Sequence, residues 1–294
     1  MSLLRYPADR RPVSLVFATF FLQLCVFFFV DQATFVMGCV LLLLIPQMSI
    51  SAFNHHHSHS NSFRITWLNA PLNLVLALQT GIPTYGWVLH HNLGHHLNYL
   101  DQENDESHWA RNDGTTMGLS EYILSNVLRM YPNMFCVGRR YPATRRRLVL
   151  QLCAVMATLG LFFYLNALNT VLVFVFPMLV KPALTFLATY SQHAGLWASD
   201  HLHASYNNLS PSYNWFFWNL GYHTAHHLKM AVHWSLLPDL HAKIETQIPE
   251  QLRLNGGTPW SFLDRRFFAN GVPVVSGIVN IENVLDAEKT QLAP

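Results

Sequence analysis

Four long runs of apolar residues constrain this chain more than any other feature of its sequence. They cover roughly residues 13–30, 33–53, 148–165 and 170–190. Each run is close to the about 20 residues that an α-helix needs to cross the hydrocarbon of a bilayer. Only 12% of the residues are charged, well below the roughly 25% of a typical soluble domain. These features predict an all-α integral membrane protein with four transmembrane helices.

The short polar segments around Asp31 and Asn166 predict that the four helices form two hairpins. Three arginines between residues 5 and 11 precede the first hairpin, and five between 139 and 147 precede the second. Cytoplasmic flanks of membrane spans are enriched in Lys and Arg. We therefore expect both hairpins to enter from the cytoplasm, with both termini and the segment between the hairpins on that side.

The segment 65–89 is apolar but is interrupted by Asn, Pro and Gly residues. We predict that it is an interfacial helix rather than a fifth span, because a span here would place the histidine-rich segments on its two sides on opposite faces of the membrane. Residues 1–294 then form a single membrane-bound domain with a cytoplasmic helical cap. The four cysteines show no CxxC spacing, which argues against a disulfide framework and favours a reducing compartment.

Most of the 17 histidines fall into three clusters, HHHSH at 55–59, HHNLGHH at 90–96 and HTAHH at 223–227. Histidine is the commonest metal ligand, and residues three or four apart on a helix share a face. On helices, His55 would pair with His59 and His91 with His95, while adjacent histidines diverge by about 100° and can serve different ions. A zinc site needs only three or four ligands. The clusters therefore predict a two-metal centre with these ligands: His55, His59, His91, His95, His96, His223, His226 and His227.

The other histidines are better explained as polar anchors or hydrogen-bonding groups near the membrane surface. His56 and His57 point away from the face that His55 and His59 share on a helix. We expect no metal ligation from the remaining members: His90, His108, His201, His203, His233 and His241.

The three clusters resemble the histidine boxes of the integral-membrane fatty acid desaturase and hydroxylase superfamily, which follow the forms HxxxH, HxxHH or HxxxHH, and HxxHH. The resemblance extends from the first apolar run to about His241. It implies two iron ions (Fe²⁺) as cofactor and O2 as co-substrate. It also implies a ninth ligand, His193, because a histidine after the fourth span lies in a similar setting in that family. Thr189 replaces an asparagine that acyl-CoA desaturases of the family carry one turn earlier.

Several charged residues near the boxes are candidates for supporting roles. Asp101 and Asp105 follow the second box and could accept the second N–H of ligating imidazoles, or could simply be solvated. Arg139 and Arg140 could contact a substrate head group, although anchoring of the third span explains them as well. Lys181 lies within the fourth span, where a charge is costly and often functional, but it could instead extend its ammonium to the interface.

The resemblance implies O2-dependent removal of hydrogen from an alkyl chain, with a fatty acid or a fatty acyl thioester as substrate. The chain carries no cytochrome, iron–sulfur or dinucleotide-binding motif, so we expect an external electron donor such as a ferredoxin with its reductase. A net charge of +2 gives no reason to expect a nucleic-acid partner.

The sequence says less about the product of the reaction than about the metal centre that oxidises the substrate. The third box and the HWSLLPDLH that follows it are similar to bacterial members that desaturate, form terminal alkynes or decarboxylate fatty acids to 1-alkenes. We favour a fatty acyl desaturase of a bacterial inner membrane, with a 1-alkene-forming decarboxylase, an alkyl hydroxylase or a terminal acetylenase as alternatives. A membrane metal carrier or sensor would need ionisable ligands along its spans, and these spans have almost none.

Overall fold

The computed structural model describes residues 2–263, which form two compact units. The first unit comprises residues up to Leu97 together with Leu124–Phe186, and the second comprises Asn98–Ile123 and the described residues from Leu187 on. Helices α5 (Leu119–Gly138) and α8 (Phe176–His193) contribute residues to both units. The prediction of a single domain over 1–294 stays a prediction.

The four predicted apolar helices are present in the described part of the chain. The segments that are long and apolar enough to cross a membrane are Pro7–Phe29, Ala33–His59, Pro142–Leu165 and Ala167–His193. They contain helices α1 (Arg10–Phe29), α2 (Ala33–His59) and α6 (Pro142–Leu165), followed by α7 (Ala167–Thr170), a π-helix (Val171–Val175) and α8. The all-α membrane fold is thus confirmed, whereas the two hairpins and the cytoplasmic cap stay predictions.

The first unit is held together by a core to which five helical segments contribute. Its members are Phe27, Val36, Val40, Ala77, Leu78, Val155, Leu159, Phe162, Val173 and Phe174. The ring of Phe162 stacks on that of Phe174 at 4.7 Å and lies 5.0 Å from that of Phe27. Such aromatic pairs stabilise a core by about 1 kcal/mol beyond the area they bury.

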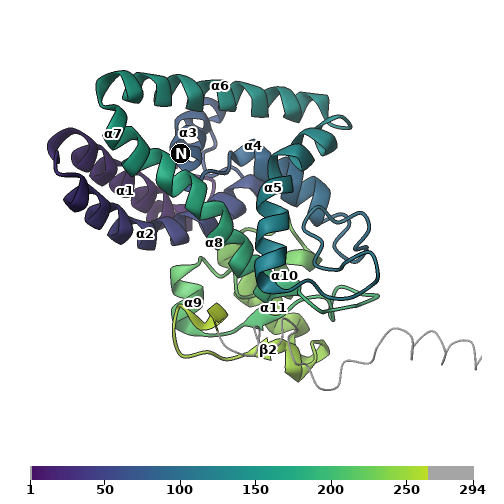
Figure 1. Cartoon of the computed structure of the whole chain (residues 1–294). Helices are drawn as coiled ribbons and strands as arrows, with labels where there is room; N and C mark the ends of the chain where they lie inside the picture. The colour runs from purple at the N-terminus through teal and green to yellow at the C-terminus, as the bar shows by residue number, and fades with distance from the viewer. Residues whose placement is uncertain (1, 264–294) are drawn as a thin grey trace, which may run out of the picture. The chain divides into compact units, whose positions relative to one another are not determined.

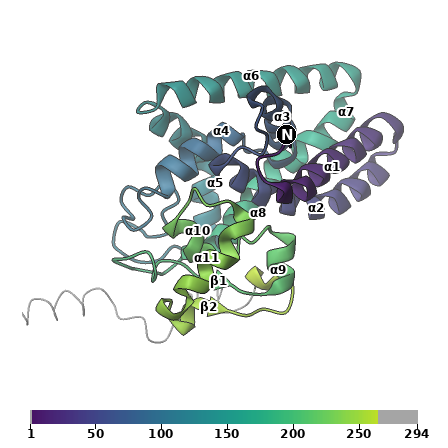
Figure 2. The ribbon, with the colours of Figure 1, turned by 180° about the vertical axis from the view of Figure 1, so that it is seen from behind.

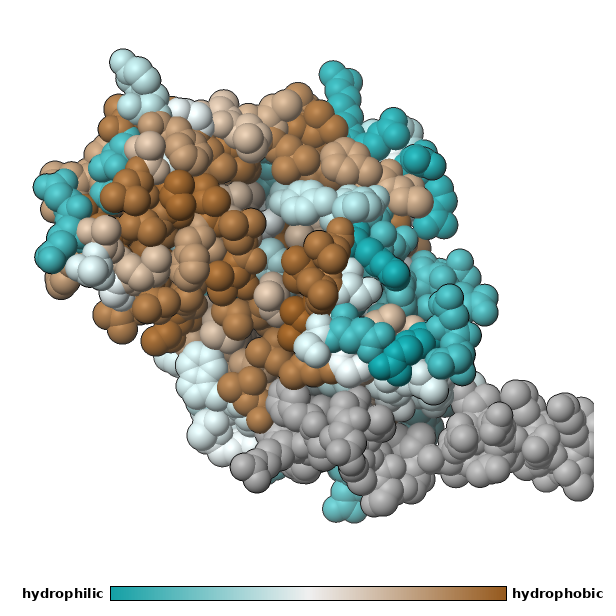
Figure 3. Space-filling model, viewed as in Figure 1, coloured by the Kyte–Doolittle hydropathy of each residue, from teal (hydrophilic) through white to brown (hydrophobic). Residues whose placement is uncertain are grey.

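The outward faces of these helices are also apolar, as lipid contact requires. Phe29 is 81% exposed and Leu42 is 69% exposed. Figure 3 shows a broad apolar face over α1 and α2, and Figure 1 shows these two helices lying side by side. An exposed apolar surface of this extent fits an integral membrane protein.

The predicted interfacial helix over 65–89 is divided in the structure. A 3-10 turn (Thr66–Leu68) leads into α3 (Asn69–Thr80), and α4 (Thr84–Trp87) begins after a sharp turn. Gly81 ends α3 with a φ of +68°, which glycine tolerates without strain, and Pro83 prevents the helix from continuing. The prediction of one continuous helix was wrong, and the chain changes direction just before the second histidine cluster.

The second unit consists of short helices and loops. It contains α9 (Pro211–Phe216), α10 (His223–Leu228), α11 (Leu237–Ile244) and a parallel pair of two-residue strands, β1 (Asn207–Asn208) and β2 (Arg253–Leu254). Figure 2 shows this pair beside α11. Asn208 donates its backbone N–H to the carbonyl of Gly221 at 2.9 Å, which fixes the segment just before α10.

Candidate metal centre

The first histidine cluster lies on the last turns of α2, because that helix continues past the predicted end of the span. The Nε2 atoms of His55 and His59 are 3.3 Å apart, as expected for positions i and i+4 on an α-helix. His55 is buried, whereas His59 is half-buried. The predicted pairing of these two imidazoles is confirmed.

The second cluster lies on a π-helix, Val88–His95. The N–H of His96 donates to the carbonyl of His91 at 2.8 Å, a bond between residues five apart that defines this helix type. The rings of His91 and His96 therefore meet edge to face at 4.5 Å. The expected pairing of His91 with His95 assumed α-helical geometry. In this helix His95 stacks on His91 at 5.2 Å, and the assignment of the three rings as ligands stays a prediction.

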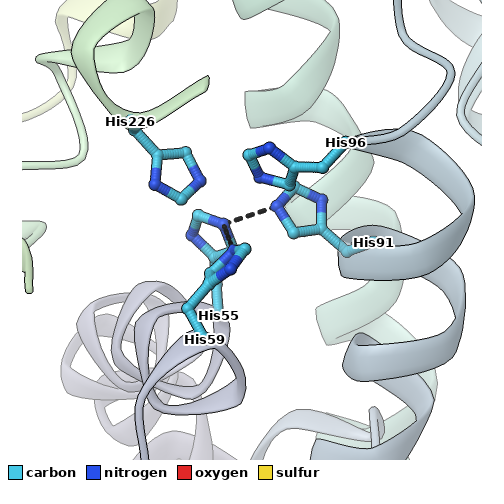
Figure 4. Close-up of side chains that lie close together, drawn as sticks. All are labelled: His55, His59, His91, His96 and His226. Carbon is cyan, nitrogen blue, oxygen red and sulfur yellow. Dashed lines mark hydrogen bonds between the residues drawn. The ribbon is translucent and has the colours of Figure 1, made fainter. Parts of the chain in front are cut away.

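The two clusters of the first unit converge on one point. One nitrogen from each of His55, His59, His91 and His96 lies within 4.8 Å of the others, and the Nε2 atoms of His55 and His91 are 2.6 Å apart. Figure 4 draws these four rings. Burial and the surrounding imidazoles lower the pKa of His91 well below its usual value, so this ring is neutral and offers a lone pair.

Asparagines on either side of the clusters hold them in register. Asn54 donates to the hydroxyl of Thr80 at 3.2 Å and to the carbonyl of Ile82 at 2.8 Å, and it accepts from the hydroxyl of Thr84 at 2.9 Å. All four residues are buried. Asn54 precedes His55 directly, so this network ties the first cluster to the turn that leads into the second.

A second link joins the two clusters themselves. The side chain of Asn92 donates to the carbonyl of Ser58 at 3.0 Å, and the hydroxyl of Ser58 donates back to the Asn92 carbonyl oxygen at 3.1 Å. The sequence analysis assigned no role to Asn54 or Asn92, although a polar residue inside each histidine-rich segment is a usable signal for such a positioning role.

In the second unit three imidazoles form a compact triangle. The Nε2 atoms of His193, His223 and His227 are 2.9 to 3.2 Å apart. His193 lies at the end of α8, and the other two lie one turn apart on α10. His193, which came from the family resemblance alone, therefore lies beside the third box.

A hydrogen bond at Nδ1, the ring nitrogen outside the triangle, fixes the orientation of His193. Its Nδ1 lies 2.9 Å from the carbonyl oxygen of Ala204, so Nδ1 carries the proton and Nε2 presents its lone pair to the triangle. Metal-bound histidines characteristically make this outer hydrogen bond. Lone pairs that face one another at 3 Å repel unless a cation or proton lies between them, so this donor set fits a metal ion.

Helix α10 is itself held in place by polar contacts. The carbonyl oxygen of the Asn207 side chain accepts the N–H of Thr224 at 3.0 Å, and its amide donates to the Thr224 hydroxyl at 2.8 Å. Ser205 also bonds that hydroxyl at 2.9 Å. Tyr99 packs its ring 4.2 Å from that of His227 and hydrogen-bonds His201, so the second unit surrounds the triangle with buried polar groups.

Two further predicted ligands lie next to these groups. His226 lies on α10, with its ring 5.7 Å from that of His223 and 5.5 Å from that of His227. His95 is 1% exposed and belongs to the first unit. Their assignment as ligands stays a prediction.

Several other histidines make contacts of a different kind. His57 is bonded at both nitrogens, to Ser62 and to Asn73, at 2.9 Å each. His203 pairs with Asp200 on the surface, and His233 accepts the N–H of Ser235 at a helix start. His108 contacts the carbonyl of Asp105 at 3.0 Å. These contacts are hydrogen bonds of the kind that the sequence analysis expected for the histidines outside the ligand set.

The supporting charges are distributed differently from the prediction. Asp101 is exposed, and its carboxylate accepts from Glu103 and Asn104 of its own loop, which favours the alternative that it is a solvated charge. Asp105 is buried and accepts from the N–H of Ser107, and its role stays a prediction.

The three candidate head-group contacts also separate. Arg139 and Arg140 are exposed in the turn between α5 and α6, whereas Lys181 is 1% exposed within α8. A surface pair and a buried cation do not form one binding site, so the predicted head-group contacts divide into two distinct environments.

Comparison with protein families gave one match. The family model described as fatty acid desaturase matches residues 32–256, a range that contains all nine candidate ligands and more than half of the chain. Neither the curated proteins nor the solved structures gave a match.

Proposed function

Since the chain belongs to the fatty acid desaturase family, we propose that it is an O2-dependent fatty acyl desaturase with a diiron centre. Membership of the family and four membrane-spanning helices make it an integral membrane oxidoreductase of the desaturase and hydroxylase kind. The choice of desaturation within that class is the proposal. The triangle of His193, His223 and His227 supports the metal centre of this proposal most directly, because a three-imidazole set suits a divalent transition metal.

The proposed ligands are the nine histidines predicted from the sequence. Four converge in the first unit and three in the second, and His95 and His226 complete the set: His55, His59, His91, His95, His96, His193, His223, His226 and His227. Two irons bound there would supply O2 activation and the oxidising power to break an unactivated C–H bond.

The protein's own residues orient the ligands and exclude competing protonation. Ala204 fixes the tautomer of His193 through its carbonyl, and the bonds between Asn92 and Ser58 hold the first two clusters in one geometry. Burial keeps His91 neutral.

The remaining parts of the proposal concern partners and location. The two electrons required come from an external ferredoxin or similar carrier with its reductase, since the chain has no redox motif of its own besides the histidine boxes. We place the protein in a bacterial inner membrane with the histidines on the cytoplasmic side, on the basis of the arginines that precede the first and third spans.

The test combines metal analysis with product analysis. Purified protein in lipid should contain about two irons per chain, and with a ferredoxin, its reductase and a fatty acid, acyl-CoA or acyl carrier protein substrate it should yield an alkene of unchanged chain length. A volatile 1-alkene one carbon shorter, or an alcohol, would replace desaturation by one of the alternatives. One zinc per chain would refute the oxygenase.

A matched pair of variants checks the ligand assignment. His193→Ala should lower the iron content and abolish the product, because His193 faces two other imidazoles. His203→Ala removes an exposed histidine that pairs with Asp200 and should retain both iron and turnover. Full iron content in the His193 variant would contradict the assignment.

A further inference from the structure

An open hollow lies in the first unit, beside the start of α1 and the end of α2. Four residues line it: Arg5, Tyr6, Ser60 and Arg64. Its volume is about 580 Å³, which is in the range of small-molecule sites. None of the four residues is a candidate metal ligand, so the hollow is a separate feature of the unit.

Two backbone hydrogen bonds bring the two arginines of the hollow together. The N–H of Arg5 donates to the carbonyl of Ser62 at 2.8 Å, and the N–H of Arg64 donates to the carbonyl of Leu3 at 2.9 Å. These bonds join the segment before α1 to the segment after α2 in an antiparallel bridge. The start of α1 and the end of α2 therefore lie at the same end of the unit.

Side-chain hydrogen bonds hold this bridge in place. The hydroxyl of Ser62, which is buried, lies 2.9 Å from Nδ1 of His57 in α2. The side chain of Asn69 accepts the N–H of Phe63 at 3.0 Å and donates to the carbonyl of Phe63 at 3.2 Å. The arginines thus project from a backbone that is already ordered, which lowers the entropic cost of binding a ligand.

Neither arginine of the hollow has a carboxylate partner among the described residues. Arg5 donates to the carbonyl of Phe63 at 3.5 Å, and Arg64 donates to the carbonyl of Arg5 at 3.3 Å, but neither forms an ion pair. Asp9, the carboxylate nearest in sequence, is 1% exposed and does not line the hollow. A guanidinium has five N–H donors, so most donors of both groups remain for a ligand. Two such groups favour an anion with several acceptor oxygens, as phosphate has.

The length of α2 places the hollow near the surface of the bilayer. The helix has 27 residues, which is about 40 Å, whereas the hydrocarbon of a bilayer is about 30 Å thick. Because α2 begins directly after the polar turn at Asp31, its last turns extend roughly 8–10 Å beyond the hydrocarbon. Ser60 follows that last turn, so the hollow lies at the depth of the lipid head groups.

Exposed apolar side chains flank the two arginines. Leu3 is 57% exposed, Ile65 is 40% exposed and Trp67 is 69% exposed. Tryptophan is enriched at head-group depth. A bilayer covers such side chains with its acyl chains while its phosphates meet the arginines, whereas a soluble acidic partner offers only the charge. The surroundings of the hollow therefore favour a lipid as its ligand.

We propose that the hollow binds the phosphate of an anionic phospholipid of the surrounding bilayer, through the guanidinium groups of Arg5 and Arg64. A head group with a net negative charge, such as that of phosphatidylglycerol, is preferred to phosphatidylcholine, because the choline ammonium would meet two cations. The bound lipid would hold the N-terminal segment against the end of α2, which carries the first histidine cluster. The site does not depend on the reaction that the protein catalyses.

Equilibrium binding in mixed detergent micelles tests the proposal. Dioleoyl phosphatidylglycerol and dioleoyl phosphatidylcholine are compared on wild type, Arg5→Gln and Arg64→Gln. We expect wild type to prefer phosphatidylglycerol. Each variant should bind it at least tenfold more weakly and bind phosphatidylcholine as wild type does. Equal binding of phosphatidylglycerol by wild type and both variants would overturn the proposal.

Arg10→Gln is the matched control. Arg10 is the first residue of α1 and is exposed, but it does not line the hollow. Its removal takes the same charge from the same end of the span and should weaken binding by about fivefold at most, the effect of one arginine near an anionic surface. A loss as large as that of Arg5→Gln would show an unspecific attraction to the surface and would refute the site.

Thermal unfolding in phosphatidylcholine nanodiscs separates binding from a structural role. Without phosphatidylglycerol, Arg5→Gln and Arg64→Gln should unfold within about 2 °C of wild type, as surface substitutions do. Added phosphatidylglycerol should raise the midpoint of wild type alone. A variant that is already destabilised without this lipid would show that its arginine serves the fold, contrary to the proposal.

Two further measurements identify the source of the phosphate. Glycerol 3-phosphate carries the phosphate without acyl chains and should not displace phosphatidylglycerol at equal concentration. Equal competition would assign the hollow to soluble phosphate esters and overturn the lipid. If Arg5→Gln slowed reduction by ferredoxin tenfold and left lipid binding unchanged, the hollow would belong to the electron carrier and the lipid proposal would be wrong.

Discussion

Replacing Gly81 with alanine should destabilise the first unit by about 3 kcal/mol. The backbone at Gly81 has a φ of +68°, which costs an L-residue with a Cβ about 1–2 kcal/mol. The added Cβ would also overlap the carbonyl oxygen of Met178 and lie 2.8 Å from its carbonyl carbon. Because both partners are backbone atoms of α8, the helix would have to move by roughly 1 Å to restore an ordinary contact. Overpacking of this kind typically costs about 1–3 kcal/mol.

The measurement is the thermal unfolding midpoint of the purified protein in one detergent. A loss of about 3 kcal/mol corresponds to a fall of roughly 6–12 °C for a chain of this size class. Gly38→Ala is the matched control, since a Cβ there meets nothing within 4 Å and alanine favours a helix interior by up to about 1 kcal/mol.

A second substitution separates strain from overlap. Asparagine tolerates a positive φ better than alanine does, but it carries the same Cβ. Gly81→Asn should therefore regain only part of the loss. An alanine variant that unfolds at the wild-type temperature would refute the close packing of this turn against α8.

Two further predictions concern the site, and a third concerns Tyr131 of α5, whose hydroxyl donates to the carbonyl of Gly81 at 2.8 Å. His55→Asn should lose bound iron, as measured by elemental analysis. His57→Asn removes a histidine that is hydrogen-bonded at both nitrogens. It should keep its iron and lose roughly 1–3 kcal/mol of stability in thermal unfolding. Asn92→Leu should lower iron content and the unfolding midpoint together, because it breaks both hydrogen bonds to the end of α2; unchanged iron would show that the link does not position the ligands. Burial raises the pKa of Tyr131 to about 12, so its contribution to stability is complete below pH 10 and is lost as the pH rises through 12, and unfolding of Tyr131→Phe across that range should lack this component of the pH dependence.

The spans could be predicted from the sequence because their signal is compositional. Twenty apolar residues in succession have few alternatives to a helix in a bilayer. The ends were less predictable: α2 continues to His59, six residues beyond the predicted end, since nothing between Phe53 and His59 breaks a helix. Gly81 and Pro83 indicate the end of a helix, but the apolar residues on both sides of them favoured the prediction of one continuous helix.

The ligand set was more predictable than its geometry. His55 and His59 pair as an α-helix dictates. The pairing of His91 with His96 depends on a π-helix, whose turn contains one residue more than an α-helical turn. Tertiary contacts determine where such a turn forms, and local helix propensity does not encode them. One of the two hydrogen bonds of His57 likewise involves Asn73, sixteen residues away.

Carboxylates near the boxes were the least predictable. Asp101 lies close to the second box in sequence, yet its own loop satisfies both oxygens, as Asp commonly does at turns. Proximity along the chain therefore said little about contact with a ligand imidazole.

The π-helix of the second cluster makes two differently spaced motifs equivalent. In the third cluster the first histidine, His223, meets His227 four positions on, in an ordinary α-helix. In the second, His91 meets His96 five positions on, and the wider turn absorbs the one inserted residue. In each motif, the imidazole of the first histidine thus meets the imidazole of the last histidine of the HH pair. Motif length and helix type change together. Deleting one residue between His91 and His96 and restoring an α-helix would therefore preserve the pairing of the two imidazoles, whereas substituting either histidine would destroy it.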